Sequence, residues 1–135
     1  MPVGKAIEGS GLDVNARTSL HELAKSLATN SYRIIVPFEI NADQDDYFPN
    51  DWGNADTVIL SASAPFNING FKAGKNGDKK VLINGSAPTI TLVHAATTSV
   101  TFNRIYGSGA ANLLLLDGAM ANIFYDGLIQ RWRAQ

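Results

Sequence analysis

Few side chains in this sequence are of the types that do chemistry: two histidines and a set of aspartates, with no cysteine. His94 follows a run of β-forming residues and could act as the base that orients a serine hydroxyl in a triad. No G-x-S-x-G elbow accompanies it, so we interpret it as a histidine bonded to the backbone at the end of a strand. His21 falls on the polar side of a predicted helix, where an exposed histidine is expected. These residues predict no catalytic site and no cofactor.

Aspartates are concentrated in one polar stretch, which is expected to be a loop from Asn41 to Asp56. Its members are Asp43, Asp45, Asp46, Asp51 and Asp56. Carboxylates of this kind could surround Ca²⁺, but their spacing departs from the EF-hand pattern, which needs glycine at the sixth position and glutamate at the twelfth. We predict a solvated acidic loop and no metal site.

A glycosidase with paired carboxylates is a further alternative. Outside the acidic stretch, Asp117 and Asp126 each precede a glycine, and Asp-Gly is first of all a signal for a hairpin turn. A polysaccharide depolymerase also needs a long groove, for which 135 residues leave little room. The sequence therefore predicts a protein that is not an enzyme.

Aromatic residues near loops are candidates for binding, because rings stack on sugars or fill a partner's pocket. Trp52, in the acidic stretch, is predicted as a contact for a partner, with packing in the core as the alternative. Trp132 stands between Arg131 and Arg133, so on a strand its indole and the two guanidinium groups occupy opposite faces. We predict that this indole lies in the core and that both arginines are solvated.

The elements that must position these residues are short runs of β-branched, leucine and aromatic residues closed by turn dipeptides. Such runs predict antiparallel strands. The fold class is therefore all-β, and we expect residues 33–135 to form an antiparallel β-sandwich resembling a jelly roll. The predicted strands are Tyr32–Ile40, Thr57–Ala62, Phe66–Gly70, Val81–Ile83, Thr89–His94, Ser99–Phe102, Leu113–Leu116, Ala121–Tyr125 and Ile129–Arg133.

Two short internal sequence similarities, which we call echoes, occur within residues 33–135. Ile68-Asn69-Gly70 recurs as Ile83-Asn84-Gly85, and residues 55–64 resemble residues 87–96. Two copies are too few for a repeat array. We expect related hairpins within one sandwich rather than a solenoid.

Residues 1–32 are predicted to form a separate segment, an extended arm followed by the one clear helix, Ser19–Thr29. Ser19 and Glu22 make a capping box, and Leu20, Leu23 and Leu27 share one apolar face. That face must cover an apolar surface, either of the same chain or of a neighbouring subunit. The arm is either frayed or a strap laid on a partner. The residues predicted to bind a partner here are Leu12, Val14, Leu20, Leu23 and Leu27.

Composition limits the classes of function. The net charge is −1 with no basic cluster, which argues against a nucleic-acid surface. No apolar run approaches the roughly 20 residues that span a bilayer. The first residues lack a continuous apolar stretch, so no signal peptide is expected. A single domain made in the cytoplasm is the expectation.

Several short motifs, which we call stations, resemble in their order and spacing a β-domain of bacteriophage virion proteins. That domain is found on tail, tail-fibre and capsid-surface components. The resemblance runs from Ile34 to Arg133. It implies an oligomeric, often trimeric, structural protein. The stations are D-Q-D-D-Y-F-P (43–49), T-V-I-L-S (57–61), I-N-G-F-K-A-G (68–74), V-L-I-N-G with I-T-L-V-H (81–94), N-R-I (103–105) and F-Y-D-G with R-W-R (124–133).

Two functions follow from this resemblance as hypotheses. The first is a capsid decoration protein on the virion, a homotrimer whose β-domain self-associates and whose N-terminal segment spreads over the major capsid protein. The second is a tail-fibre or receptor-binding module that recognises a glycan or protein on the host surface. A tail fibre normally carries a longer attachment shaft, so we expect the first.

Overall fold

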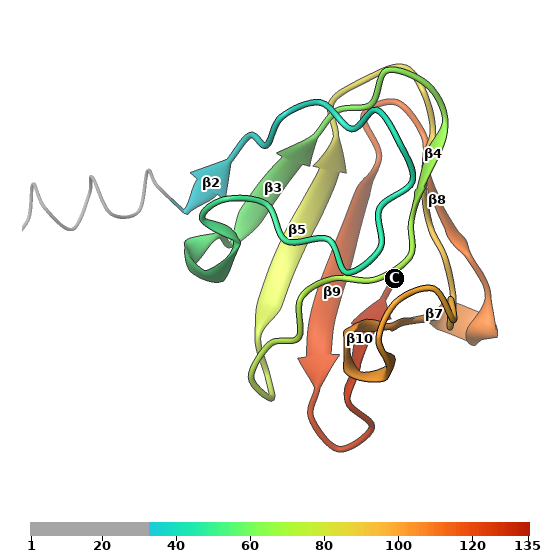
Figure 1. Ribbon diagram of the computed structural model, residues 1–135. Helices are drawn as coiled ribbons and strands as arrows, with labels where there is room; N and C mark the ends of the chain where they lie inside the picture. Colours follow the sequence, from blue (N-terminus) through green and yellow to red (C-terminus); the bar gives the residue numbers. More distant parts are fainter. Residues whose placement is uncertain (1–32) are drawn as a thin grey trace, which may run out of the picture. The chain divides into compact units, whose positions relative to one another are not determined.

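The computed structural model describes residues 33–135, and in this part the backbone winds through three stacked coils, residues 34–56, 57–80 and 81–104. The first wall of the coils consists of β2 (Ile34–Ile35), β3 (Thr57–Leu60) and β5 (Lys79–Asn84), hydrogen-bonded in parallel. Thr57 pairs with Val81, 24 residues further along the chain. Strands of successive coils lie side by side in Figure 1. This arrangement is a short β-solenoid.

A second wall repeats the same parallel stacking. Strand β4 (Phe66–Ile68) pairs in parallel with β6 (Ile90–Leu92), again with an offset of 24 residues between Phe66 and Ile90. The first coil contributes single parallel bridges, Gln44 with Ile68 and Tyr47 with Phe71. The same stacking therefore continues around the perimeter of the coils.

Residues 105–135 close the last coil with strands of mixed direction. These strands are β7 (Ile105–Gly107), β8 (Leu113–Leu115), β9 (Met120–Asp126) and β10 (Arg131–Ala134). Strand β8 runs antiparallel to β6, β9 antiparallel to β5, and β10 antiparallel to β9, while β7 is parallel to β10. The result is a six-stranded sheet in the order β2-β3-β5-β9-β10-β7 and a three-stranded sheet in the order β4-β6-β8. Three 3-10 helices complete the described chain: Trp52–Asn54, Thr101–Asn103 and Ser108–Ala110.

The core lies inside the coils and is filled by alternate residues of each strand. Val58, Leu82 and Ile123 point inward and are fully buried. An aromatic cluster joins the first two coils to strands β9 and β10, and within it Trp52 stacks on Phe71 with ring centroids 5.1 Å apart. The indole Nε1 of Trp132 donates a hydrogen bond to the carbonyl oxygen of Lys72 at 3.0 Å. The cluster comprises Tyr47, Trp52, Phe71, Tyr125 and Trp132.

The all-β class is confirmed, but the predicted antiparallel, jelly-roll sandwich is wrong. In the described chain the strands of the first three coils pair in parallel, and antiparallel strand pairs involve β8, β9 and β10, beside one isolated antiparallel bridge between Gly70 and Arg104. A strand of one coil carries the same β-branched residues and turn signals as a strand of a hairpin, so these patterns do not reveal direction. The expectation against a solenoid is therefore wrong as well.

One local prediction fails because a side chain binds a backbone group. Ser99–Phe102 is not a strand, since the Asp46 carboxylate accepts the N–H of Val100 and residues 101–103 form a 3-10 helix. The acidic stretch is mostly a loop, as predicted, with single bridges at Gln44 and Tyr47 and a 3-10 helix at Trp52–Asn54. The predicted arm and helix, with Leu12, Val14, Leu20, Leu23 and Leu27, lie outside the described residues.

Candidate functional site

The outer face of the six-stranded sheet is the candidate site, and one end of it is mainly apolar. Alternation along β3, β5 and β9 directs one set of side chains inward and the other outward. Ile59, Ile83 and Met120 form one outward row across three neighbouring strands. Ile34 and Met120 keep 53% and 64% of their surface exposed. We call the outward residues Ile34, Ile59, Val81, Ile83 and Met120 the apolar half. The polar residues Thr57 and Asn122 stand in the same row as Ile34 and Val81.

The apolar half has a clear origin in the sequence. The runs Thr57–Leu60 and Val81–Ile83 are continuously apolar or β-branched, which is the pattern of parallel strands covered on both faces. A sheet with one solvated face would instead alternate apolar and polar residues. The outward row of the second sheet fits that other rule in part, with half-buried Asn67 and Thr91 beside exposed Leu114. The two walls therefore differ in what they present to the surroundings.

The other end of the same face carries cations and aromatic rings. Register places Lys79, Phe124, Arg133 and Tyr106 in one outward row over β5, β9, β10 and β7. Arg131 lies two residues before Arg133 and so faces the same side. We call Lys79, Tyr106, Phe124, Arg131 and Arg133 the cationic half.

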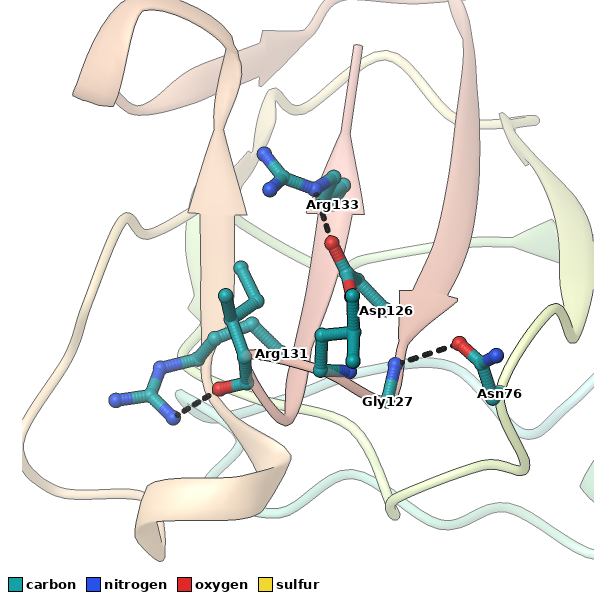
Figure 2. Close-up of polar contacts among 7 residues, drawn as sticks. Asn76, Asp126, Gly127, Arg131 and Arg133 are labelled. Atoms are coloured by element: carbon teal, nitrogen blue, oxygen red, sulfur yellow. Dashed lines mark hydrogen bonds and ion pairs between the residues drawn. The ribbon is translucent and has the colours of Figure 1, made fainter.

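Arg133 is held by one carboxylate. Its Nε donates to Asp126 Oδ2 at 2.9 Å, as Figure 2 shows. The hydrogen bond from Arg133 and those from the backbone N–H groups of Leu128 and Ile129 hold the pKa of Asp126 below its usual range. The carboxylate is therefore ionised across the ordinary pH range and keeps the guanidinium in place.

His94 borders the cationic half and has a defined hydrogen bond. Its Nδ1 accepts the backbone N–H of Gly107 at 3.1 Å, and its ring packs edge-on against Tyr106 with centroids 4.9 Å apart. The prediction of a strand-end histidine bonded to the backbone is confirmed. Because Nδ1 is the acceptor, the neutral ring carries its proton on Nε2.

The structure does not support Trp52 as a contact for a partner. Its side chain is only 3% exposed, and it is packed between Phe71 and the edges of Tyr47 and Trp132. Asp51 adopts a left-handed conformation (φ 64°), and the 3-10 turn that follows carries the indole into the core. The core alternative is correct. Trp132 is fully buried, as predicted, and Arg133 is exposed, whereas Arg131 is half-buried because its Nη1 donates to two backbone carbonyl oxygens.

Four of the five aspartates of the acidic stretch are exposed, as predicted, and three of the five also bind groups of the second or third coil. Asp43 Oδ1 accepts the backbone N–H of Asn67 at 2.9 Å, and Asp45 Oδ1 accepts the Asn69 amide at 2.8 Å. Asp46 Oδ1 accepts from Val100 N and Asn103 Nδ2. Among residues 33–135, no group of three or more carboxylate, histidine or cysteine side chains is placed to hold a metal ion.

A buried lysine is a feature that the sequence reasoning missed. Lys80 Nζ donates to the carbonyl oxygens of Trp52 (2.6 Å) and Ala55 (2.7 Å) and lies 4.7 Å from the Trp52 ring centroid. Burial lowers its pKa, while Asp78 and Asp56 oppose that shift. The signal was its position, since Lys80 shares the inward parity of Leu82 and Asn84 in β5. It fastens the turn of the first coil to the sheet.

Comparison of the chain with protein-family models, with curated proteins and with solved structures finds no match in any of the three. The described residues also contain no helix of the length and apolar character needed to cross a membrane. The resemblance to virion proteins thus stays an expectation drawn from the sequence.

Proposed function

We propose that this chain is a non-enzymatic structural protein of a bacteriophage particle, a capsid decoration protein that binds the capsid surface as a homotrimer. The observation that carries the proposal is the apolar half of the six-stranded sheet. Outward Ile59, Val81 and Ile83 sit beside exposed Ile34 and Met120 on one wall. Covering such a surface with protein contributes about 1.5–3 kcal/mol for each large apolar side chain that becomes fully buried. In the proposed homotrimer, the apolar halves are covered by neighbouring copies.

The polar groups fit a role in binding rather than in turnover. His94 Nδ1 is occupied by a backbone N–H, so this nitrogen does not pair with a carboxylate as the base of a triad does. A glycosidase acid needs a raised pKa, whereas Arg133 lowers that of Asp126. Both groups hold the fold at this end of the sheet.

A receptor-binding module of a tail or tail fibre is the second candidate. It is favoured by the cationic half, where Tyr106 and Phe124 stand beside arginine side chains on a broad sheet face. Aromatic rings next to hydrogen-bond donors are typical of surfaces that bind sugars. Host glycan or host protein would be its partner.

The location of the chain on the particle tests the proposal. Gln135 is exposed at the chain end and its backbone pairs with Asn122, so a label added after it leaves the strand pairing intact. We expect electron microscopy of particles carrying labelled copies to place the label over the capsid lattice. Label confined to fibres or to the tail tip would replace the first function with the second, and particles without label would overturn both.

A further inference from the structure

We infer that the cationic half is a binding site for the carboxylate of an acidic saccharide, with Arg133 as its central residue. This site goes beyond the first proposed function, which uses the apolar half of the face, and it specifies the ligand of the second candidate, on whose sugar-binding surface it rests. It also stands on different residues. The inference therefore holds or fails independently of whether copies of the chain form a trimer.

The first step is the orientation of the Arg133 guanidinium. Asp126 occupies only its Nε, and the Tyr106 ring lies 5.4 Å from its Cζ. Within residues 33–135, neither Nη1 nor Nη2 of Arg133 has a protein partner. Figure 2 shows this end of the guanidinium directed away from Asp126. A fork of two parallel donors, fixed on one side by a carboxylate, matches the two oxygens of a second carboxylate.

The second step is the set of neighbouring donors. Because Nδ1 of His94 accepts a hydrogen bond, the neutral ring carries its proton on Nε2, which is available as a donor. The His94 ring contacts the Tyr106 ring. The Tyr106 hydroxyl makes no hydrogen bond to any described residue, and this side chain is 41% exposed. Hydroxyl groups of a sugar are both donors and acceptors and can use each of these positions.

The third step is local charge. The cationic half holds Lys79, Arg131 and Arg133 and contacts one acid, Asp126, although the whole chain has a net charge of −1. Lys79 lies two strands from Arg133, which is roughly 10 Å at ordinary strand spacing. Arg131 Nη1 is bound to the carbonyl oxygens of Ile129 and Gln130 and is therefore fixed in place near the β9–β10 turn. A ligand with repeated negative charges fits this spread of cations.

The aromatic rings favour a saccharide among anionic ligands. Phe124 neighbours Arg133 directly in the outward row and is half-buried, which leaves part of its ring accessible. Apolar C–H faces of a pyranose ring pack on such rings, whereas inorganic phosphate gains nothing from them. The planar fork of Arg133 also matches the planar carboxylate of a uronic acid.

The experiment is titration of the full chain with an oligomer of galacturonic acid, followed by calorimetry and by NMR of the arginine Nε–H signals. The methyl ester of the same oligomer is the matched ligand, since it keeps the rings and loses the charge. We expect binding of the acid and none of the ester. Arg133→Gln should weaken binding by about tenfold or more, because a hydrogen bond to a charged group is lost. Arg133→Lys should weaken it similarly, because a lysine keeps the charge but lacks the fork.

Lys72→Gln is the control variant, because this substitution removes one positive charge at a different place on the protein. Lys72 Nζ lies over the ring of Phe48 in the first coil. This variant should bind the oligomer as the natural chain does. Near-ultraviolet circular dichroism of each variant checks that the fold is kept. The inference is overturned if the acid does not bind, if the ester binds equally, if Arg133→Gln and Lys72→Gln behave alike, or if equimolar inorganic phosphate displaces the oligomer.

Discussion

Two buried side chains with polar ends, Lys80 and Tyr47, both contact the Trp52 ring. Lys80 places its ammonium over Trp52, where two carbonyl oxygens accept its protons. Tyr47 packs edge-on against Trp52 and Phe71, and its hydroxyl has no hydrogen-bond partner within the described chain. Burial raises the pKa of Tyr47 to about 12. An ionised phenolate would have to give up water without a compensating donor, so the fold resists its formation.

Alkaline unfolding should report this residue. Between pH 10 and pH 12 the unfolded chain loses the Tyr47 proton while the folded chain keeps it, so the free energy of unfolding falls as the pH rises. The loss over that window is roughly 2–3 kcal/mol. Urea unfolding from pH 9 to pH 12, compared with Tyr47→Phe, measures it. The lowered pKa of Lys80 acts in the opposite sense, since stability gains as the pH rises toward 10.5, but it is common to both proteins. Equal slopes for the two proteins would contradict the prediction.

The two tryptophans show where residue types suffice and where they do not. Trp132 lies within an alternating run, and alternation alone placed its indole inside and its two arginines outside. Trp52 follows polar residues with no period, so nothing in the sequence signalled the left-handed Asp51 and the 3-10 turn that bury it. The polar neighbours of Trp52 suggested an exposed side chain, but the left-handed conformation of Asp51 directs the indole inward.

At the scale of elements, the positions of most strands could be predicted and their partners could not. The predicted runs at 57–62, 66–70, 81–83, 113–116 and 121–125 each overlap an observed strand. The echoes in the sequence recur after 15 and 32 residues, whereas structural partners lie 24 apart, as Phe66 and Ile90 do. Successive coils share their length and their pattern of buried positions rather than identical residues. The segments with similar sequences are therefore not the segments that pair in the structure. Tyr32–Ile40 shortened to β2 with a bridge at Ile40, because Pro37 cannot donate to a ladder.

Close approach of two coils sets a requirement for glycine at one position. A Cβ added to Gly70 would lie 2.5 Å from Ser99 Oγ and 2.7 Å from the carbonyl oxygen of Asn103. Gly70→Ala should therefore destabilise the fold by about 1–3 kcal/mol, the usual cost of overpacking. Gly53→Ala, with no atom within 4 Å of the new Cβ, is the matched control and should change stability by less than about 0.5 kcal/mol. Thermal unfolding of both variants decides the matter, and equal melting temperatures would refute the tight contact.

At the scale of the molecule, a single sheet face carries two kinds of surface. The parallel coil strands supply most of the apolar half, to which β9 adds Met120. The added strands β9, β10 and β7 supply most of the cationic half, to which β5 adds Lys79. The sequence contained both patterns, but they could be assigned to one face only when the register was known. If the trimer forms through the apolar half, the cationic half stays at the border of the contact, where it remains accessible to the proposed acidic saccharide.

Oligomeric state is the property that the apolar half should control. We expect light scattering to give three chains per particle for the natural protein and one for Met120→Lys, because the new ammonium would have to be buried among isoleucine side chains at the contact. Met120 is 64% exposed, so the substitution should leave the isolated fold intact. Leu114→Lys provides the control, since Leu114 is 57% exposed but faces outward from the second sheet, and it should stay trimeric. A trimer that survives Met120→Lys but not Leu114→Lys would move the contact to the other wall. A natural protein that is monomeric at high concentration would remove the need for any such contact.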